Sequence, residues 1–376
     1  MQLFHRWLTG LALSALIWSS WLTGAALCAA TPAEAATLSS PLIAYLPPGN
    51  AVTDGRALLR YSLPIDNKDI RTVQESLEGL SEWLRSKRWG PIVRDTNKVN
   101  KLLGRRREAI LADIPAARQT LAAEYLDDIR AGLEPIITSA KDREREPIWI
   151  KRGELLDKVG AIEEMMVEGF PYEVPEEYSS LPQLKGRATV EFETSKGTVT
   201  AVIDGYTAPV TGGNFVDLVQ RGFYDGMPFI RAEDNYVLQT GDPEGPEEGF
   251  IDPKTGEYRA VPLEILIKGD EAPIYGSTLE ELGLYLEEPV LPFSAYGVMG
   301  LARPANDVNG GSSQFFFFLF EPELTPAGLN LLDGRFAVFG CVVDNKEVLE
   351  ALGQGDRIIA ARVVDGLENL VIPQMT

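Results

Sequence analysis

The chain has 376 residues and a formal net charge of −20 at pH 7, and this charge argues against binding to nucleic acid or to anionic lipid surfaces. Its one histidine, His5, and one of its two cysteines, Cys28, lie in the first 35 residues, and Cys341 is the other cysteine. Loss of those 35 residues would exclude histidine triads, histidine-ligated zinc and cysteine-pair redox chemistry, so we expect neither a metal nor a cofactor.

Residues 1–35 have the composition of a secretory signal peptide. An uncharged stretch from Trp7 to Ala33 follows Arg6, and the sequence Ala33-Glu34-Ala35 is typical of a cleavage site. An uncleaved membrane anchor is the alternative, because the apolar run is long. We expect cleavage after Ala35 or Ala36, export, and no stable membrane insertion of the processed chain.

The next part of the chain is expected to be helical. Residues 36–65 form an N-terminal arm in which RALLRYSLP could be a short strand. Residues 66–170 contain four apolar stripes at helical spacing, which predict an antiparallel helical bundle. The first stripe consists of Ile70, Val73, Leu77, Leu80 and Leu84. Prolines and Gly186 end the helical pattern, so residues 171–186 are interpreted as a linker.

Three consecutive arginines, Arg105 to Arg107, lie in the segment that carries the second of these stripes. One interpretation is a solvated helix face. The other is a basic docking site on an otherwise acidic protein, and the sequence leaves both open.

Residues 187–376 change to the alternating pattern of β-strands. Two strands are joined across Ser195-Lys196-Gly197, as in a hairpin. One amphipathic helix ends near Gly222, and a second carries Val348, Leu349 and Leu352. Many short strands with only two helices predict a closed antiparallel barrel, so the fold class is α+β with two domains.

The order of elements and several motifs in residues 187–373 resemble the cyclophilin family. The motifs are NF at Asn214-Phe215, FIR at Phe229–Arg231, QTGD at Gln239–Asp242, YG at Tyr275-Gly276, SQFFF at Ser313–Phe317 and LDGRFAVFG at Leu332–Gly340. The resemblance implies an eight-stranded barrel capped by two helices and the activity of a peptidyl-prolyl cis-trans isomerase. The whole architecture is similar to the large cyclophilins of the thylakoid lumen, which implies that location, with the periplasm as the alternative.

The resemblance assigns the catalytic role to Arg231. Prolyl isomerisation must cross a barrier of about 18 to 20 kcal/mol that is set by amide resonance. An arginine that donates a hydrogen bond to the prolyl nitrogen, as that nitrogen becomes pyramidal, stabilises the twisted transition state. The substrate-binding positions implied by the resemblance are Tyr236, Val237, Gln239, Ala302, Gln314, Phe316, Leu331, Leu332 and Phe336.

This chain departs from the family pattern at several of these positions. Leu331 stands where the family usually has a tryptophan, and Phe336 stands where a histidine usually lines the proline pocket. Arg303 follows Ala302 where asparagine is common, and Tyr236 replaces a phenylalanine. These changes predict low isomerase activity, or none on short peptides.

An acidic insertion, residues 243–274, is longer than the corresponding loop of a minimal cyclophilin. From Asp242 to Tyr275, with both ends included, the sequence has nine acidic and three basic residues. The insertion is interpreted either as a solvated loop or as an acidic arm that docks a basic partner or covers the groove. Its apolar segment VPLEILI predicts at least one packed strand.

Two functional hypotheses follow. In the first, the chain is an exported isomerase of low activity that acts on proline-containing clients as a foldase or assembly factor, and the resemblance implies that photosystem II subunits are among these clients. In the second, it is a catalytically inactive chaperone or scaffold that binds partners through the helical bundle and the acidic insertion.

Overall fold

The computed structural model describes residues 52–233, 235–320 and 330–373. The expected signal peptide, and the expected arm as far as residue 51, lie outside these residues. None of the described helices combines the length and the hydropathy that a membrane span requires.

The described part of the arm is helical. Helix α1 (Gly55–Ser62) occupies the segment in which a short strand seemed possible, so that expectation is wrong. The carboxylate of Asp54 caps the helix by accepting a hydrogen bond from the backbone N–H of Ala57 at 2.9 Å. Leu58 and Leu59 of α1 are both buried in an apolar cluster with residues of the C-terminal sheet region, which we call the β-domain. The capping aspartate therefore stabilises the first turn of α1.

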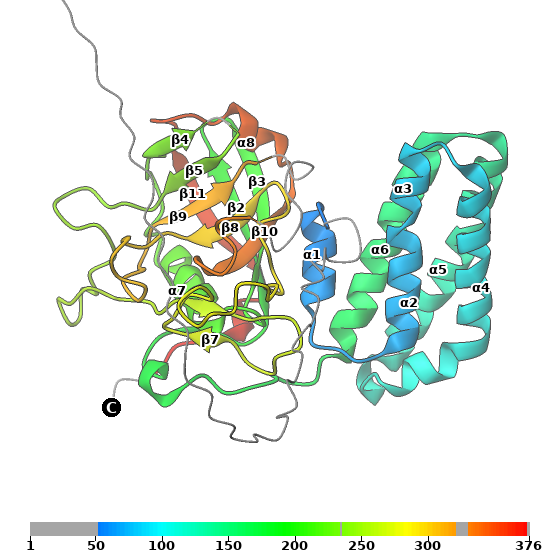
Figure 1. Cartoon of the computed structure of the whole chain (residues 1–376), viewed down its shortest axis with the longest axis horizontal. Coiled ribbons are helices and arrows are strands. Elements are labelled where there is room, and N and C mark those ends of the chain that lie inside the picture. Colours follow the sequence, from blue (N-terminus) through cyan, green and yellow to red (C-terminus); the bar gives the residue numbers. More distant parts are fainter. Residues whose placement is uncertain (1–51, 234, 321–329, 374–376) are drawn as a thin grey trace, which may run out of the picture. The chain divides into compact units, whose positions relative to one another are not determined.

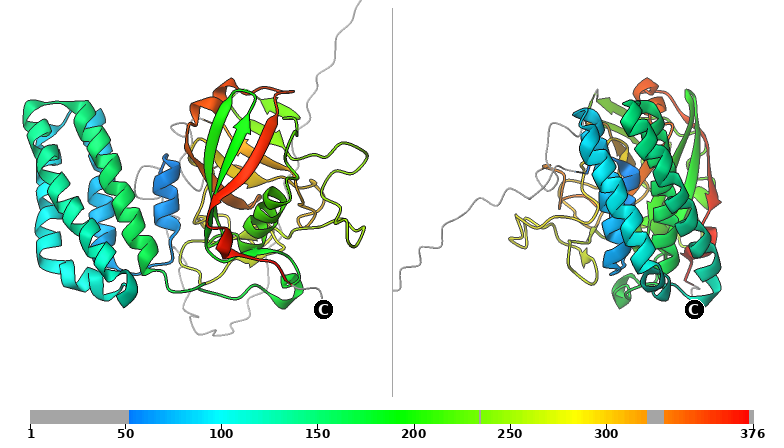
Figure 2. Two further views of the ribbon diagram at one scale, coloured as in Figure 1. Left: turned by 180° about the vertical axis from the view of Figure 1, so that it is seen from behind. Right: turned by 90° about the vertical axis from the view of Figure 1, so that its right-hand side faces the viewer.

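Five helices follow and form the predicted helical region (Figure 1). They are α2 (Lys68–Glu78), α3 (Leu80–Arg85), α4 (Trp89–Ala112), α5 (Ala116–Asp142) and α6 (Arg145–Met166). Helix α4 packs on α2 and α5, and α6 packs on the same two helices, which is the arrangement of a four-helix bundle with α3 extending α2. Figure 2 shows these long helices running side by side. All five apolar residues of the first predicted stripe are buried in the bundle core.

The second region is an antiparallel sheet of eight strands. Its spatial order is β11-β2-β3-β10-β8-β9-β5-β4. The strands are β2 (Arg187–Thr194), β3 (Gly197–Asp204), β4 (Arg231–Glu233), β5 (Val237–Thr240), β8 (Val298–Leu301), β9 (Phe315–Phe318), β10 (Val338–Asp344) and β11 (Ile358–Asp365). Helices α7 (Pro209–Gln220) and α8 (Glu347–Ala351) accompany the sheet, and β2 and β3 form the predicted hairpin.

The sheet is open between its edge strands β11 and β4, so the predicted closure of the barrel is not confirmed. An isolated bridge between Pro228 and Arg357 lies close to these edges. Proline has no backbone N–H to donate, which limits continuous pairing at this point.

Two shorter pairs of strands lie outside the main sheet. Strand β1 (Gln183–Leu184) pairs with β12 (Leu370–Val371), and β6 (Glu264–Ile265) pairs with β7 (Ile274–Tyr275). Strand β6 is the packed strand that the apolar segment of the acidic insertion predicts.

Apolar clusters cover both faces of the main sheet. One cluster packs between the sheet and α7 and contains Phe192, Phe215 and Phe315. The other includes Phe316 and the two leucines of α1. Helix α1 approaches β10 closely at Gly55, which has no side chain. A Cβ atom there would lie 3.0 Å from the carbonyl oxygen of Val342. The arm therefore contributes apolar contacts to the same cluster as the expected proline pocket.

Candidate functional site

Arg231, the expected catalytic residue, lies in one row with two of the expected substrate-binding residues across neighbouring strands. Arg231 of β4 is opposite Gln239 of β5, Gln239 is opposite Phe316 of β9, and Phe316 is opposite Gly300 of β8. Directly opposed residues in antiparallel strands project from the same face of the sheet. Strand pairing therefore brings Arg231, Gln239 and Phe316, which are distant in sequence, to one surface.

The ring of Phe316 is fixed by other aromatic rings. Phe293 stacks on it with ring centroids 5.7 Å apart, and Phe336 meets it edge-on at 5.6 Å. Phe316 and Phe293 both approach β8 where it has no side chain: a Cβ atom at Gly300 would lie 2.5 Å from Phe316 Cζ and 2.8 Å from Phe293 Cζ. Phe293 and Gly300 were missed at the sequence level, although a glycine inside a strand pattern is a known sign of close approach.

The structure brings together five of the nine expected substrate-binding residues in this apolar cluster. They are Val237, Ala302, Phe316, Leu332 and Phe336. Two others are more exposed: Tyr236 touches the edge of the cluster, and Leu331 lies outside it. Tyr236 is 36% exposed and meets Phe318 edge-on at 6.4 Å, and Leu331 is 79% exposed and lines a shallow hollow with Leu284 and Tyr285.

Arg231 lies at the exposed edge of the row and is held by a carboxylate on its own strand. Its Nε donates to Glu233 Oε1 at 2.8 Å, and its Nη2 lies 2.6 Å from the same oxygen. Both side chains are about half exposed. A guanidinium group has five N–H donors, so this contact positions Arg231 and leaves other donors for a ligand.

The two expected amide side chains form a hydrogen-bonded chain that ends in the acidic insertion. Gln239 Nε2 donates to Gln314 Oε1 at 2.8 Å, and Gln314 Nε2 donates to Asp242 Oδ1 at 3.0 Å and to the Glu248 carbonyl at 2.9 Å. Burial, and next the charge of Glu248, raise the pKa of Asp242. The N–H donors of Gln314 are therefore engaged before any substrate arrives.

Beside these amides lies a pocket of about 130 Å³. Its wall includes Glu248 and Tyr258 from the acidic insertion, together with Ala302 and Arg303 from the barrel side. Arg303 donates from Nη2 to the carbonyl of Arg335 at 2.9 Å, and its guanidinium lies 5.1 Å from the ring centre of Phe336. The insertion thus forms one wall of this pocket, which we call the groove. Arg303 covers one edge of the aromatic cluster.

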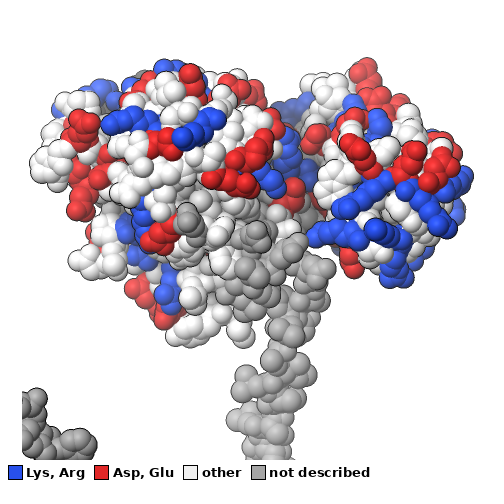
Figure 3. All heavy atoms as spheres, turned by 90° about the horizontal axis from the view of Figure 1, so that it is seen from above, with Lys and Arg blue, Asp and Glu red and all other residues white. Residues whose placement is uncertain are grey.

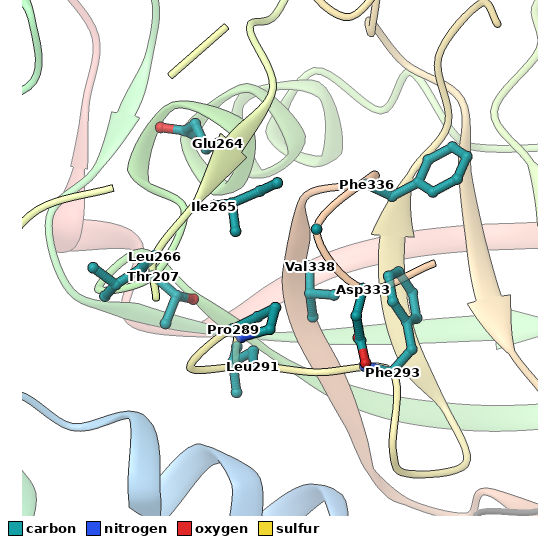
Figure 4. A pocket seen from close by; sticks show the side chains of 11 residues that line it. Thr207, Glu264, Ile265, Leu266, Pro289, Leu291, Phe293, Asp333, Phe336 and Val338 are labelled. Carbon is teal, nitrogen blue, oxygen red and sulfur yellow. The ribbon is translucent and has the colours of Figure 1, made fainter. Parts of the chain in front are cut away.

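A second cavity lies behind the aromatic cluster (Figure 4). Figure 4 shows Phe293, Phe336 and Val338 on one side of it, and Glu264 and Ile265 of β6 on the other. Its volume of about 10 Å³ leaves no room for a substrate.

Glu264, on the wall of this cavity, is fully buried and ties the insertion to α7. Its two carboxylate oxygens accept hydrogen bonds from the backbone N–H groups of Val210 and Thr211, at 3.0 and 2.7 Å. Burial raises the pKa of Glu264 to about 7, and these hydrogen bonds at the helix N-terminus oppose the rise. Glu264 therefore attaches the insertion to the β-domain and takes no part in the row of Arg231.

The described residues contain no group of three or more histidine, cysteine, aspartate or glutamate side chains that could hold a metal ion. Cys341 is a free thiol buried under α1, and burial raises its pKa well above the ordinary range. The row itself offers the hydrogen-bond donors of Arg231 and Gln239 beside the apolar ring of Phe316.

Two protein-family models match the chain. Residues 54–167 match "Peptidyl-prolyl cis-trans isomerase CYP38-like, PsbQ-like domain". Residues 189–368 match "Cyclophilin type peptidyl-prolyl cis-trans isomerase/CLD".

Two relatives are similar over most of their length. One, from Synechocystis sp., is provisionally named a thylakoid lumen peptidyl-prolyl cis-trans isomerase; it is 54% identical over 330 residues, which cover 88% of this chain and 87% of the relative. The other is the chloroplastic peptidyl-prolyl cis-trans isomerase CYP38 of Arabidopsis thaliana. It is 46% identical over 358 residues, which cover 92% of this chain and 82% of the relative. A crystal structure of a cyclophilin type isomerase from Cryptosporidium parvum aligns with 48% of this chain and 98% of its own, at 20% identity and a TM-score of 0.35.

Proposed function

This chain belongs to the cyclophilin-type peptidyl-prolyl cis-trans isomerases with a CYP38-like helical domain, and from that premise we propose that it isomerises prolyl bonds in exported protein clients at a low rate. The observation that carries the proposal is the row of Arg231, Gln239 and Phe316 across β4, β5 and β9. It supplies a guanidinium donor, an amide and an aromatic floor on one surface.

The chemistry that this row supports is stabilisation of a twisted amide. A proline ring packs on Phe316, and Arg231 donates a hydrogen bond to the prolyl nitrogen as the nitrogen loses its planar geometry. The planar ground state offers that nitrogen no lone pair, so the interaction forms only in the transition state. Donors of this kind lower barriers by about 2.7 to 4 kcal/mol, out of the roughly 18 to 20 kcal/mol of the uncatalysed reaction.

Four contacts support a low rate. Arg231 is bonded to Glu233, the donors of Gln314 are taken by Asp242 and Glu248, and Arg303 lies over Phe336. A peptide must displace the contacts of Gln314 and Arg303 before it occupies the groove, and it competes with Glu233 for Arg231. Short peptides offer little binding energy for this, so an unfolded protein is the better substrate.

The occupied donors also support the second hypothesis, a catalytically inactive chaperone or scaffold. In that case partners bind through the helical bundle and through the acidic insertion, which would act as a docking arm or cover the groove. The names of the relatives, one for the thylakoid lumen and one for the chloroplast, support a location in the thylakoid lumen over the periplasm. We propose that the proline-containing clients include photosystem II subunits, and that the chain serves as an assembly factor for them.

A refolding assay tests the proposed activity. The client is a protein whose last refolding step is a slow prolyl isomerisation, and the full chain is added at increasing concentrations. The isomerase proposal predicts that the slow rate rises in proportion to the concentration of the chain, with a smaller effect on a proline tetrapeptide. An unchanged rate, together with saturable binding of the unfolded client, would favour the scaffold.

A further inference from the structure

One face of α4 carries a continuous line of positive charge. We call Arg94, Lys98, Lys101 and Arg105 the basic stripe. Their spacing of four, three and four residues places them on a single face of the helix, and all four are exposed. Helix α4 contains six Lys and Arg against two Asp and Glu, in a chain whose net charge is −20. Positive charge is therefore concentrated here against the general trend.

Most of the stripe is not neutralised by the protein itself. Arg94 pairs with Asp95 at 2.7 Å, while its side chain stays 66% exposed. Across the ranges that the structure describes, Lys98, Lys101 and Arg105 form no ion pair within 4.0 Å. These three cations lie at the surface, where water or a partner can bind them.

The arginine triplet that follows the stripe divides between two roles. Arg106 lies 2.9 Å from Asp69 of α2, and Arg107 lies 2.6 Å from Asp127 of α5. These two ion pairs link α4 to its neighbouring helices. Arg105 alone continues the exposed stripe.

The stripe lines an open hollow of about 680 Å³ on the surface of the bundle. Half-buried Leu102 and the amide of Asn97 lie among the cations and give the hollow apolar and hydrogen-bonding surface. Figure 3 shows Lys and Arg atoms gathered over part of the helical region. Asp95 also lines the hollow, and its carboxylate is paired with Arg94. Cations spread along the helix around an apolar side chain fit a polypeptide better than a lone inorganic anion.

We propose that the basic stripe binds an extended acidic segment of a partner polypeptide. The eleven residue-to-residue steps from Arg94 to Arg105 rise by about 16 Å along the helix, which is the length of roughly five residues in an extended chain. Carboxylates on alternate residues of such a chain lie about 7 Å apart on one side. The cations of the stripe follow one another at about 4.5 to 6 Å, so successive carboxylates meet successive cations.

Charge complementarity selects this occupant over others. An anionic membrane or a nucleic acid presents a broad negative surface that would also meet the acidic residues spread over the rest of the chain. A short acidic segment can contact the stripe without meeting those acidic residues. Binding of a second copy of the chain would give a different result in the test below.

Fluorescence anisotropy tests the proposal with the full chain. The probe is a fluorescein-labelled heptapeptide in which glutamates alternate with glycines, and the matched probe has glutamine in place of each glutamate. We expect the acidic probe to bind, the glutamine probe to bind much more weakly, and binding to weaken as salt rises from about 20 to 150 mM. A variant with Lys98→Gln, Lys101→Gln and Arg105→Gln should bind the acidic probe about tenfold more weakly.

A control variant removes the same charge from exposed residues away from α4, through Lys141→Gln, Arg145→Gln and Lys254→Gln. It should bind the acidic probe within about twofold of the parent, and both variants should melt like the parent because all six side chains are exposed. Equal loss in both variants, or equal binding of the two probes, would overturn the proposal. So would tighter binding to anionic vesicles than to the peptide, or a salt-sensitive self-association that the stripe variant abolishes.

Discussion

Gly300 and Phe316 are directly opposed in the β8–β9 ladder, and a Cβ atom at residue 300 would lie 2.5 Å from Cζ of the Phe316 ring. Heavy atoms do not approach so closely, so the ring position depends on the absence of a side chain there. Phe293 fills the remaining space and stacks on the same ring. The floor of the proposed proline pocket is thus set by a glycine on the neighbouring strand.

We expect Gly300→Ala to lower the free energy of unfolding by about 1 to 3 kcal/mol, because the added methyl group displaces two buried rings. The isomerase rate should fall with it, since the displaced ring is the floor of the pocket. Urea unfolding and the refolding assay measure the two effects. Gly153→Ala in α6 is the control, because a Cβ atom there would meet nothing within 4 Å beyond the neighbouring backbone of its own helix, and it should be neutral or slightly stabilising. Similar results for both variants would count against this account of the pocket.

Leu58→Ala should destabilise the β-domain although residue 58 lies far from it in sequence. The Leu58 side chain is 3% exposed and belongs to the cluster that contains Phe316. Removing a buried leucine costs about 2 to 5 kcal/mol. Leu121→Ala, at a position that is 44% exposed in α5, is the matched control and should cost less than about 1 kcal/mol. Denaturant unfolding followed by near-ultraviolet circular dichroism compares them, and equal losses would contradict the packing of α1.

Stability should fall as the pH rises from about 5 to 8, in part through Glu163. This side chain is fully buried, 3.2 Å from Arg71, and burial raises its pKa to about 7 despite the opposing charge of Arg71. The folded state then holds a proton that the unfolded state releases near 4.5, so the stabilisation is complete below that pH and is lost as the pH passes 7. The loss is at most about 3 kcal/mol.

Urea unfolding at pH 5 and pH 8 checks this for the parent and for Glu163→Gln, which cannot ionise. The variant should show a smaller difference between the two pH values. An identical difference in parent and variant would mean that Glu163 stays ionised in its pair with Arg71.

Cyclosporin-type ligands should bind weakly, and Leu331→Trp should strengthen their binding by about tenfold. Leu331 is 79% exposed at the position where the family places a tryptophan, and an aliphatic side chain has no N–H to donate. One regained hydrogen bond with its apolar contact is worth about 1.5 kcal/mol. Isothermal titration calorimetry measures both proteins. Submicromolar binding by the parent would contradict the prediction.

Much of the architecture could be predicted because it is encoded locally. The stripe from Ile70 to Leu84 follows the helical period, and all of its residues are buried. The hairpin at Ser195-Lys196 depends on a two-residue turn and a following glycine, both visible in the sequence. The resemblance to cyclophilins then placed Arg231, Gln239 and Phe316 in one site.

The features that could not be predicted depend on contacts between distant segments. Helix α1 was taken as a possible strand, because its burial comes from β10, almost 300 residues away. The role of Phe293 depends on the packing of a loop against β8 and β9. The bonds from Gln314 to Asp242 and Glu248 depend on the path of the insertion, which has no periodic pattern.

The isomerase rate of Arg231→Ala tests the proposed function most directly. If Arg231 donates the hydrogen bond to the prolyl nitrogen, its removal costs about 2.7 to 4 kcal/mol of transition-state stabilisation, a loss of roughly a hundredfold or more in kcat/KM. The melting temperature should stay nearly unchanged, because the side chain is about half exposed. Glu233→Gln, which releases Arg231 from its ion pair, should keep or raise the rate. A full-length Arg231→Ala chain that catalyses client refolding as fast as the parent would contradict the proposal that Arg231 is the catalytic residue.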